Sequence, residues 1–175
     1  MQNNRSQANI LVVDDARENL QLLTQLLQEQ GYRVRPAPNG AHALATVLKE
    51  PPDLILLDVV MPEMNGYEVC RHLKENKESQ NIPIIFLSAL HDTEDKITAF
   101  TAGGVDYITK PFQADEVLAR VHTHLSLRFL QQELESINET LEEKVADRTA
   151  KLAQTNHELQ AEIAQRIRTE QEKDR

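Results

Sequence analysis

Residues 53–58 read Asp-Leu-Ile-Leu-Leu-Asp, a short apolar run that ends at a carboxylate. Two other runs have the same form: Ile-Leu-Val-Val at 10–13 precedes two aspartates, and Ile-Pro-Ile-Ile-Phe-Leu at 82–87 precedes a serine. Strands that are buried on both faces form continuous apolar runs of this kind, and they belong to parallel sheets covered by helices. The three runs therefore predict the central strands of a parallel sheet.

Helical periodicity connects these runs. Apolar residues recur at helical spacing in four segments, at 17–30, 39–50, 67–74 and 92–102. Two weaker strands are expected, at 32–35 just before Pro36 and at 105–109. The β-α order, repeated five times, predicts a doubly wound α/β sheet with right-handed crossovers. Ligands bind such sheets at the carboxyl ends of the strands, where the strand order reverses.

Glycine and proline divide the chain into two parts. All 5 Gly and all 7 Pro lie at or before Pro111, and residues 112–175 contain neither. Both residue types are unfavourable inside helices, so a long helix should follow a compact domain. The expected parts are a tail at 1–8, a domain at 9–125 and a helix at 126–175.

Composition excludes several classes of protein. The net charge of −9 repels the phosphates of nucleic acid, so direct nucleic-acid binding is not expected. No apolar run approaches ~20 residues and the N-terminus lacks the apolar part of a signal peptide, which favours a cytoplasmic protein without membrane contact. The single cysteine, Cys70, fits a reducing compartment and reads as a small buried residue.

Polar side chains stand where four of the predicted strands end. They are Asp14 and Asp15, Asp58, Ser88 and Lys110. Each alone has an ordinary interpretation, as a helix cap, a turn residue or a surface lysine. Together they should meet at one edge of the sheet, and three neighbouring carboxylates repel one another unless a cation lies among them. Mg²⁺, which prefers oxygen ligands, is the expected ion.

Four segments resemble the receiver domains of two-component response regulators. They are Val-Val-Asp-Asp at 12–15, Leu-Leu-Asp-Val-Val-Met-Pro-Glu-Met-Asn-Gly-Tyr-Glu-Val at 56–69, Phe-Leu-Ser-Ala at 86–89 and Gly-Gly-Val-Asp-Tyr-Ile-Thr-Lys-Pro-Phe at 103–112. The resemblance covers roughly residues 8–125. It implies a flavodoxin-like, five-stranded parallel sheet with strand order 2-1-3-4-5.

The resemblance also implies roles for the strand-end residues. Asp58 would accept a phosphoryl group from a sensor histidine kinase or a phosphotransfer protein. Asp15 would bind Mg²⁺ directly, Asp14 mostly through water, and Val60 through its backbone carbonyl.

Three more residues follow from the same resemblance. Lys110 would pair with a phosphoryl oxygen, and Ser88 would hydrogen-bond the attached phosphoryl group. Tyr107 would be the aromatic switch residue that turns inward when Ser88 moves. The Lys110–Pro111 peptide bond would be cis.

A phosphatase of the haloacid-dehalogenase type is the alternative enzyme. Such enzymes also use an Asp nucleophile after a strand, with a second Asp two residues later as general acid. Val60 occupies that position here and cannot donate a proton. The sequence therefore favours a phosphoacceptor, with only self-phosphorylation and slow self-dephosphorylation expected.

Four charged residues resemble the ion pairs of receiver dimers. Lys96 would pair with Glu116, and Asp106 with Arg120, across the dimer. The alternative is that all four are ordinary surface charges.

The C-terminal segment has the apolar spacing of a coiled coil. The expected seam consists of Leu127, Leu130, Leu134, Ile137, Leu141, Val145, Leu152 and Leu159. The spacing from Ile137 to Leu141 and from Leu141 to Val145 is four residues each time, and two such spacings in succession mark a stutter in the heptad pattern. After it, Arg148 and Thr155 occupy the seam positions between the apolar residues Val145, Leu152 and Leu159. A parallel homodimer is expected, the alternative being a single exposed or folded-back helix.

Residues 141–164 resemble the signalling-helix linkers that join receiver or sensor modules to output modules. One hypothesis is that the switch regulates an attached output domain beyond residue 175. The other is a stand-alone dimeric response regulator whose coiled coil docks a separate partner.

Overall fold

The computed structural model describes residues 8–89 and 93–173, with the side chains of 93–96 and 173 excepted. The chain divides into two compact units, Met1–Phe129 and Leu130–Arg175. Each unit is described by itself.

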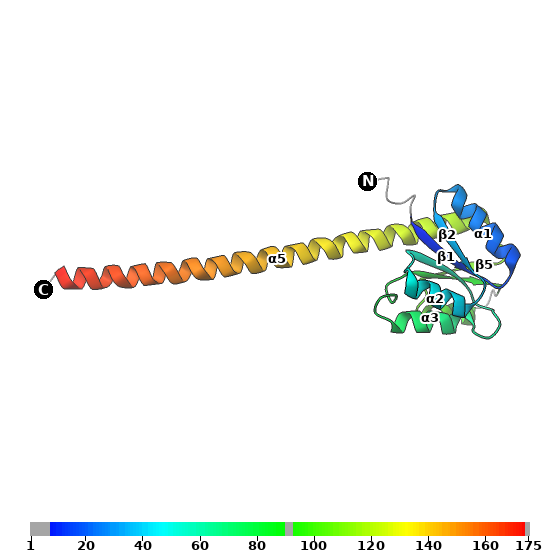
Figure 1. Ribbon diagram of the computed structural model, residues 1–175, viewed down its shortest axis with the longest axis horizontal. Coiled ribbons are helices and arrows are strands. Elements are labelled where there is room, and N and C mark those ends of the chain that lie inside the picture. The colour runs from blue at the N-terminus through cyan, green and yellow to red at the C-terminus, as the bar shows by residue number, and fades with distance from the viewer. Residues whose placement is uncertain (1–7, 90–92, 174–175) are drawn as a thin grey trace. The chain divides into compact units, whose positions relative to one another are not determined.

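The first unit is built on a five-stranded parallel sheet. Its strands are β1 (Asn9–Val13), β2 (Arg33–Ala37), β3 (Leu54–Asp58), β4 (Ile84–Ser88) and β5 (Asp106–Thr109). Their order is β2-β1-β3-β4-β5, which confirms the predicted topology (Figure 1). The three central strands β1, β3 and β4 are buried at every position, as their continuous apolar runs predicted.

Helices cover both faces of this sheet (Figure 1). They are α1 (Arg17–Glu29), α2 (Gly40–Lys49), α3 (Gly66–Glu75), α4 (Thr93–Thr101) and α5 (Ala114–Lys173). Apolar residues of α1 and of the first turns of α5 pack on one face in a single buried cluster. Residues of α2, α3 and α4 form the second cluster on the other face. Alternate residues of each central strand contribute to the two clusters, so both faces of the sheet are buried.

The edge strand β2 differs slightly from its predicted range. It was expected to end at Arg35, but it continues through Pro36, which lies opposite Val12 of β1, and Ala37. Proline is compatible with an edge strand because its missing N–H can lie on the unpaired side. Strand β4 begins at Ile84, two residues after the start of the apolar run at 82–87.

The start of α3 is fixed by a capping box. Asn65 Oδ1 accepts the N–H of Glu68 at 2.9 Å, and Glu68 Oε2 accepts the N–H of Asn65 at 2.9 Å. These reciprocal bonds satisfy two helix N-terminal donors. They also anchor the loop that returns from β3, which carries part of the site.

Cys70 of α3 is fully buried, as predicted. Its Sγ donates to the backbone carbonyl of Ala102 at 3.2 Å. Burial raises the pKa of the thiol to about 11, so it stays protonated near neutral pH.

The second unit is the part of α5 beyond Phe129. Every described residue from Leu130 to Glu172 is exposed, including the apolar residues of the predicted seam from Leu130 onward. Among the described residues, no helix combines the length and the apolar character needed to span a membrane.

Candidate functional site

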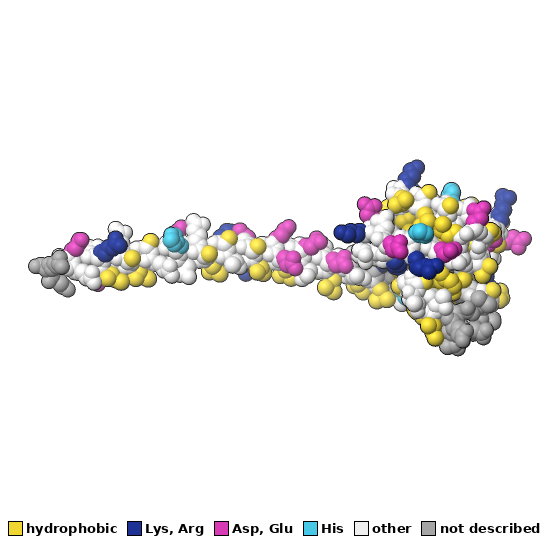
Figure 2. Space-filling view, turned by 90° about the horizontal axis from the view of Figure 1, so that it is seen from below, with side chains coloured by type: hydrophobic (Ala, Val, Ile, Leu, Met, Phe, Trp, Pro, Cys, Tyr) yellow, Lys and Arg dark blue, Asp and Glu magenta, His cyan; other side chains and the backbone are white. Residues whose placement is uncertain are grey.

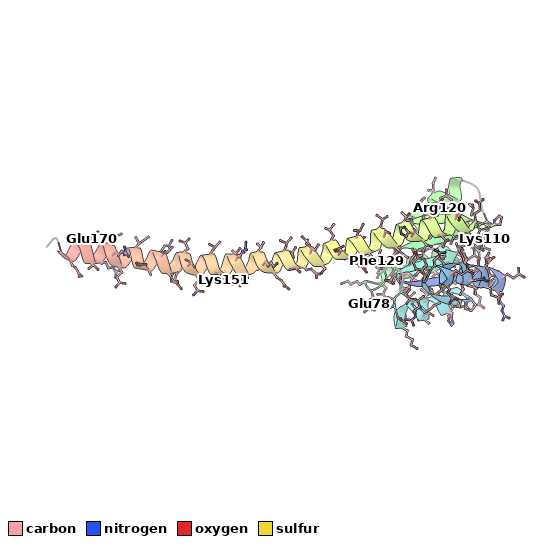
Figure 3. All side chains as sticks on the ribbon, turned by 90° about the horizontal axis from the view of Figure 1, so that it is seen from above. Glu78, Lys110, Arg120, Phe129, Lys151 and Glu170 are labelled. Atoms are coloured by element: carbon pink, nitrogen blue, oxygen red, sulfur yellow. The ribbon has the colours of Figure 1, made fainter. Side chains whose placement is uncertain are left out.

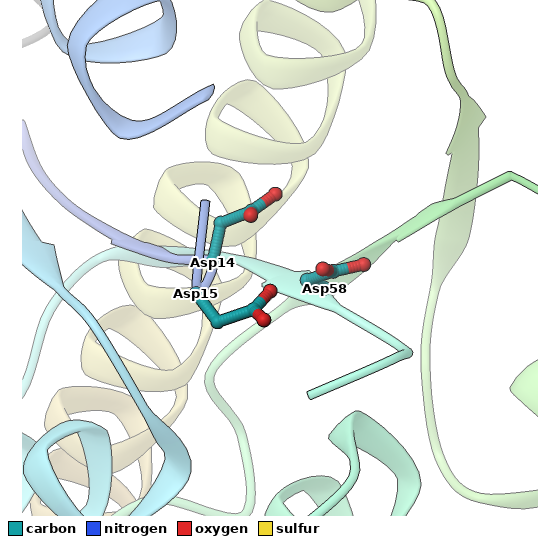
Figure 4. A group of neighbouring side chains, drawn as sticks. All are labelled: Asp14, Asp15 and Asp58. Atoms are coloured by element: carbon teal, nitrogen blue, oxygen red, sulfur yellow. The ribbon is translucent and has the colours of Figure 1, made fainter. Parts of the chain in front are cut away.

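Three carboxylates meet at the carboxyl edge of the sheet (Figure 4). Asp14 and Asp15 directly follow β1, and Asp58 is the last residue of β3. One oxygen of each lies within 4.8 Å of the others. Asp14 is 0% exposed and Asp58 4%, whereas Asp15 is open to solvent. The parallel register of β1 and β3 thus produces the predicted cluster.

Lys110, the residue after β5, bridges two of these carboxylates. Its Nζ lies 2.9 Å from Asp14 Oδ2 and 3.0 Å from Asp58 Oδ2. Burial alone would lower the pKa of Lys110, but its hydrogen bonds to the two carboxylates outweigh burial and raise that pKa. Lys110 therefore remains a cation facing Asp58. The Lys110–Pro111 peptide bond is cis, as the resemblance implied.

Burial raises the pKa of the Asp58 carboxyl above its ordinary value of 3.8. The hydrogen bond from Lys110 lowers this pKa, and the charge of Asp14 raises it. One ammonium pairs with two of the three neighbouring carboxylates, so the cluster has excess negative charge beside the buried Asp14 and Asp58. Such a set of oxygen donors fits a hard divalent cation.

Two donors that the sequence did not reveal hold the Asp14 carboxylate. Oδ1 accepts the backbone N–H of Ala16 at 2.8 Å, and Oδ2 accepts the side-chain amide of Asn19 at 3.0 Å. Asn19 lies in the first turns of α1. Only its place five residues after Asp14 could have indicated this contact, and that spacing is not specific.

The loop after β3 approaches the site through Gly66. The N–H of Gly66 donates to the carbonyl of Val59 at 2.9 Å, and a Cβ at this glycine would lie 2.2 Å from the carbonyl oxygen of Asp58. A side chain at this position would require the neighbouring backbone to shift. The same loop carries Val60, whose N–H lies 3.4 Å from Asp58 Oδ1 and whose side chain is 65% exposed.

Ser88 and Tyr107 belong to the neighbouring strands. Ser88 ends β4 and is buried, and its carbonyl accepts the N–H of Lys110 at 2.8 Å. Tyr107, in β5, is half-buried, with its ring edge-on to Phe100 at 6.4 Å between centroids. Arg120 lies 5.7 Å from the Tyr107 centroid. The proposed switching roles of both residues stay predictions.

Three of the four charged residues expected at a dimer face, Asp106, Glu116 and Arg120, pair with one another within the chain. Arg120 on α5 (Figure 3) pairs with Asp106 at 2.6 Å and with Glu116 at 3.0 Å. His124 Nε2 lies 2.9 Å from the other oxygen of Asp106. Pairing across a dimer would compete with these contacts. The side chain of Lys96, the fourth residue, lies outside the described residues.

These contacts shift the pKa values of Asp106 and Arg120. Burial alone would raise the pKa of Asp106, but the hydrogen bonds from Arg120 and His124 outweigh burial and lower it. The hydrogen bond to Asp106 raises the pKa of Arg120. Asp106 thus joins β5 to α5 as a carboxylate.

The fold and site define a doubly wound α/β domain with an acidic, cation-compatible centre at the carboxyl edge of its sheet. Residues 10–122 match the family model for the response regulator receiver domain. The chain therefore belongs to the family of response regulator receiver domains.

Curated relatives are longer than this chain. It is 42% identical over 147 residues to the "Probable cyclic di-GMP phosphodiesterase" of Vibrio cholerae serotype O1, covering 84% of this chain and 33% of that protein. It is 39% identical over 127 residues to the response regulator PleD of Caulobacter vibrioides, covering 73% of this chain and 28% of that protein. The chain thus spans about a third of these relatives.

Solved structures of response regulators and chemotaxis proteins are also similar to this chain. The chemotaxis protein CheY4 of Vibrio cholerae matches with a TM-score of 0.65 and 31% identity, covering 67% of this chain and 98% of that one. The receiver domain of Francisella response regulator 1452 matches with a TM-score of 0.64 and 34% identity, covering 68% and 97%.

Proposed function

We propose that the chain is a phosphorylation-dependent switch whose phosphoacceptor is Asp58. The observation that carries this proposal is the buried Asp58 carboxylate, paired with Lys110 at 3.0 Å beside two further carboxylates. A carboxylate oxygen of Asp58 attacks the phosphorus of a phosphohistidine, the P–N bond breaks, and its electron pair returns to the imidazole. The donor is a sensor histidine kinase or a phosphotransfer protein.

Asp14, Asp15, Asp58 and the backbone carbonyl of Val60 would hold Mg²⁺. When bound, the ion neutralises charge on the phosphoryl oxygens during transfer. The open position of Asp15 suits direct coordination, whereas Asp14 is already engaged by Ala16, Asn19 and Lys110.

The remaining side chains act on the attached phosphoryl group. Lys110 pairs with one phosphoryl oxygen, because its ammonium already lies beside the Asp58 carboxylate. Ser88 donates a hydrogen bond to another phosphoryl oxygen, and Tyr107 then turns toward the place that Ser88 leaves. Beyond its own phosphorylation and slow dephosphorylation, the domain carries out no turnover.

The described part of α5 beyond Phe129 then passes this change on. Its exposed apolar seam forms a parallel coiled-coil homodimer. The alignment with the Vibrio cholerae relative spans 147 residues, more than the family match at 10–122, which favours a shared role for this helix. The helix therefore controls an output module, either in the same polypeptide or in a separate partner.

Phosphorylation by a small donor tests the proposal. Incubation with Mg²⁺ and acetyl phosphate should add one phosphoryl group to wild type and none to Asp58→Asn, measured by intact mass. Glu63→Gln, at an exposed residue of the loop after β3, is the control and should be labelled like wild type. Equal labelling of Asp58→Asn would show that another residue is the phosphoacceptor.

A further inference from the structure

The part of α5 beyond the stutter carries its own apolar face. Its large apolar side chains are between 50% and 70% exposed. They are Val145, Leu152, Leu159, Ile163 and Ile167. Figure 2 shows hydrophobic side chains along one side of this helix.

One polar residue lies in the middle of this face. At about 100° per residue, Leu152 lies about 20° to one side of Val145 around the helix axis, and Asn156 about 20° to the other. Ile163 lies at nearly the same angle as Val145. Arg148 and Thr155, which the heptad spacing placed at the seam, lie on its flank at about 60° and 80°. The face therefore has an asparagine at its centre.

The polar side chains near this face differ in whether they have a hydrogen-bond partner within the helix. Thr149 Oγ1 donates to the carbonyl of Val145 at 2.8 Å, and Thr155 Oγ1 donates to that of Lys151 at 3.0 Å. Both hydroxyls are thus satisfied within the helix. Among the described residues, the Asn156 side chain has no such partner. Its amide has both a donor and an acceptor to offer.

Charged side chains lie outside the centre of this face. Between Val145 and Ile167, no residue within about 40° of Val145 around the helix axis is charged. The Arg166 guanidinium, on the flank, lies 2.7 Å from Glu162, and the Lys151–Asp147 pair, also at 2.7 Å, lies on the opposite side of the helix. The surface that fits this face is therefore apolar, with one amide near its centre. The same face of a second copy has this chemistry.

We propose that this face packs against itself in a second copy, parallel and in register, with Asn156 hydrogen-bonded to Asn156 of the partner subunit. The inference rests on the homodimer proposed above and adds its orientation and register. A primary amide is self-complementary, so the in-register pair satisfies both side chains. A shift by one heptad would set one Asn156 against Thr149 and the other against Ile163 of the opposite chain, so the amide pair would be lost.

Disulfide formation in the full chain tests the orientation. Single cysteines at Leu141 and at Ile163, each in a Cys70→Ser background, should both give disulfide-linked dimers. In a parallel in-register pair each position faces its own copy. An antiparallel pair can bring only one of the two positions opposite itself, so the loss of either crosslink would overturn the proposal.

A mixed sample tests the register. Chains with Leu152→Cys and chains with Leu159→Cys crosslink to each other only when the helices slip by one heptad. Wild-type Asn156 should suppress this mixed disulfide, and Asn156→Leu should increase it. Asn138→Leu, at an asparagine on the flank of the earlier seam, is the matched control and should leave the mixed disulfide rare.

Sedimentation and the mixed disulfide together distinguish the homodimer from the Asn156 pairing. A chain that sediments as a monomer would overturn both the pairing and the homodimer. A dimer whose mixed disulfide is unaffected by Asn156→Leu would overturn the role of Asn156 alone. Asp58→Asn labelling is independent of both outcomes.

Discussion

Asn19 supports the site without being one of the three carboxylates. Its amide donates to Asp14 Oδ2 at 3.0 Å, the oxygen that Lys110 also contacts. We expect Asn19→Leu to weaken Mg²⁺ binding about tenfold, because Asp14 loses a donor that sets its orientation. Calorimetric titration of the unphosphorylated protein with Mg²⁺ measures this. Gln21→Leu, at an exposed residue of α1, is the control, and equal affinities of the two variants would exclude the supporting role.

Gly66 allows the loop after β3 to lie against Asp58. A methyl group there would lie 2.2 Å from the Asp58 carbonyl oxygen, so Gly66→Ala should cost about 2–3 kcal/mol of unfolding free energy and slow phosphorylation by acetyl phosphate. Gly104→Ala is the comparison, since its Cβ would lie 2.4 Å from the ring of Phe86. That variant should lose comparable stability but keep the phosphorylation rate. If both lose the rate equally, stability alone explains the effect.

The residues of the site differ in how far the sequence predicted them. Asp14, Asp58 and Lys110 end strands in a parallel sheet, so topology alone brings them together. Asn19 and the intrachain partners of Arg120 were not predicted. Those contacts depend on side-chain conformations across two elements, and no spacing along the chain specifies them.

At the scale of elements, Asp106 joins β5 to α5 through Arg120 and His124. Because folding lowers the pKa of Asp106, its contribution to stability is present above about pH 4, the unfolded value being 3.8. That contribution is lost as the pH falls through the folded-state pKa. We expect Asp106→Asn to cost about 1–3 kcal/mol at pH 7, and less at pH 3.

Urea unfolding of wild type and Asp106→Asn at both pH values measures this difference. Glu139→Gln, at an exposed residue of α5, should show no difference at either pH. A cost of Asp106→Asn that is the same at pH 3 and pH 7 would contradict the ionic account.

Elements were predicted well where burial is uniform and less well at edges. The continuous runs of β1, β3 and β4 identified the strands, but Pro36 made the end of β2 appear earlier than it is. Edge strands lack the second neighbour that makes burial continuous, so their sequence carries less information. The heptad spacing predicts a seam along α5, and that seam stays a prediction. The spacing does not include Asn156, which shares the face of Val145 and Ile163 through its angle around the helix.

At the scale of the molecule, both hydrophobic clusters lie within residues 8–129. We expect residues 1–129 alone to unfold within a few degrees of the full chain and to accept a phosphoryl group at the same rate, while losing self-association. Calorimetry, intact mass and sedimentation measure these three properties. If the truncated protein of residues 1–129 still dimerises, the dimer interface lies within the first unit.

The hydrogen bond from Cys70 to Ala102 also has a practical consequence. The chain holds one thiol, it is buried, and its pKa near 11 keeps it unreactive in the closed fold. A thiol reagent therefore modifies native protein only during transient opening of the α3 side, and the modification rate reports how often that side opens. Ala102 directly follows α4. A modification rate of Cys70 that changes when beryllofluoride is added would therefore show that the contact between α3 and the end of α4 has loosened or tightened.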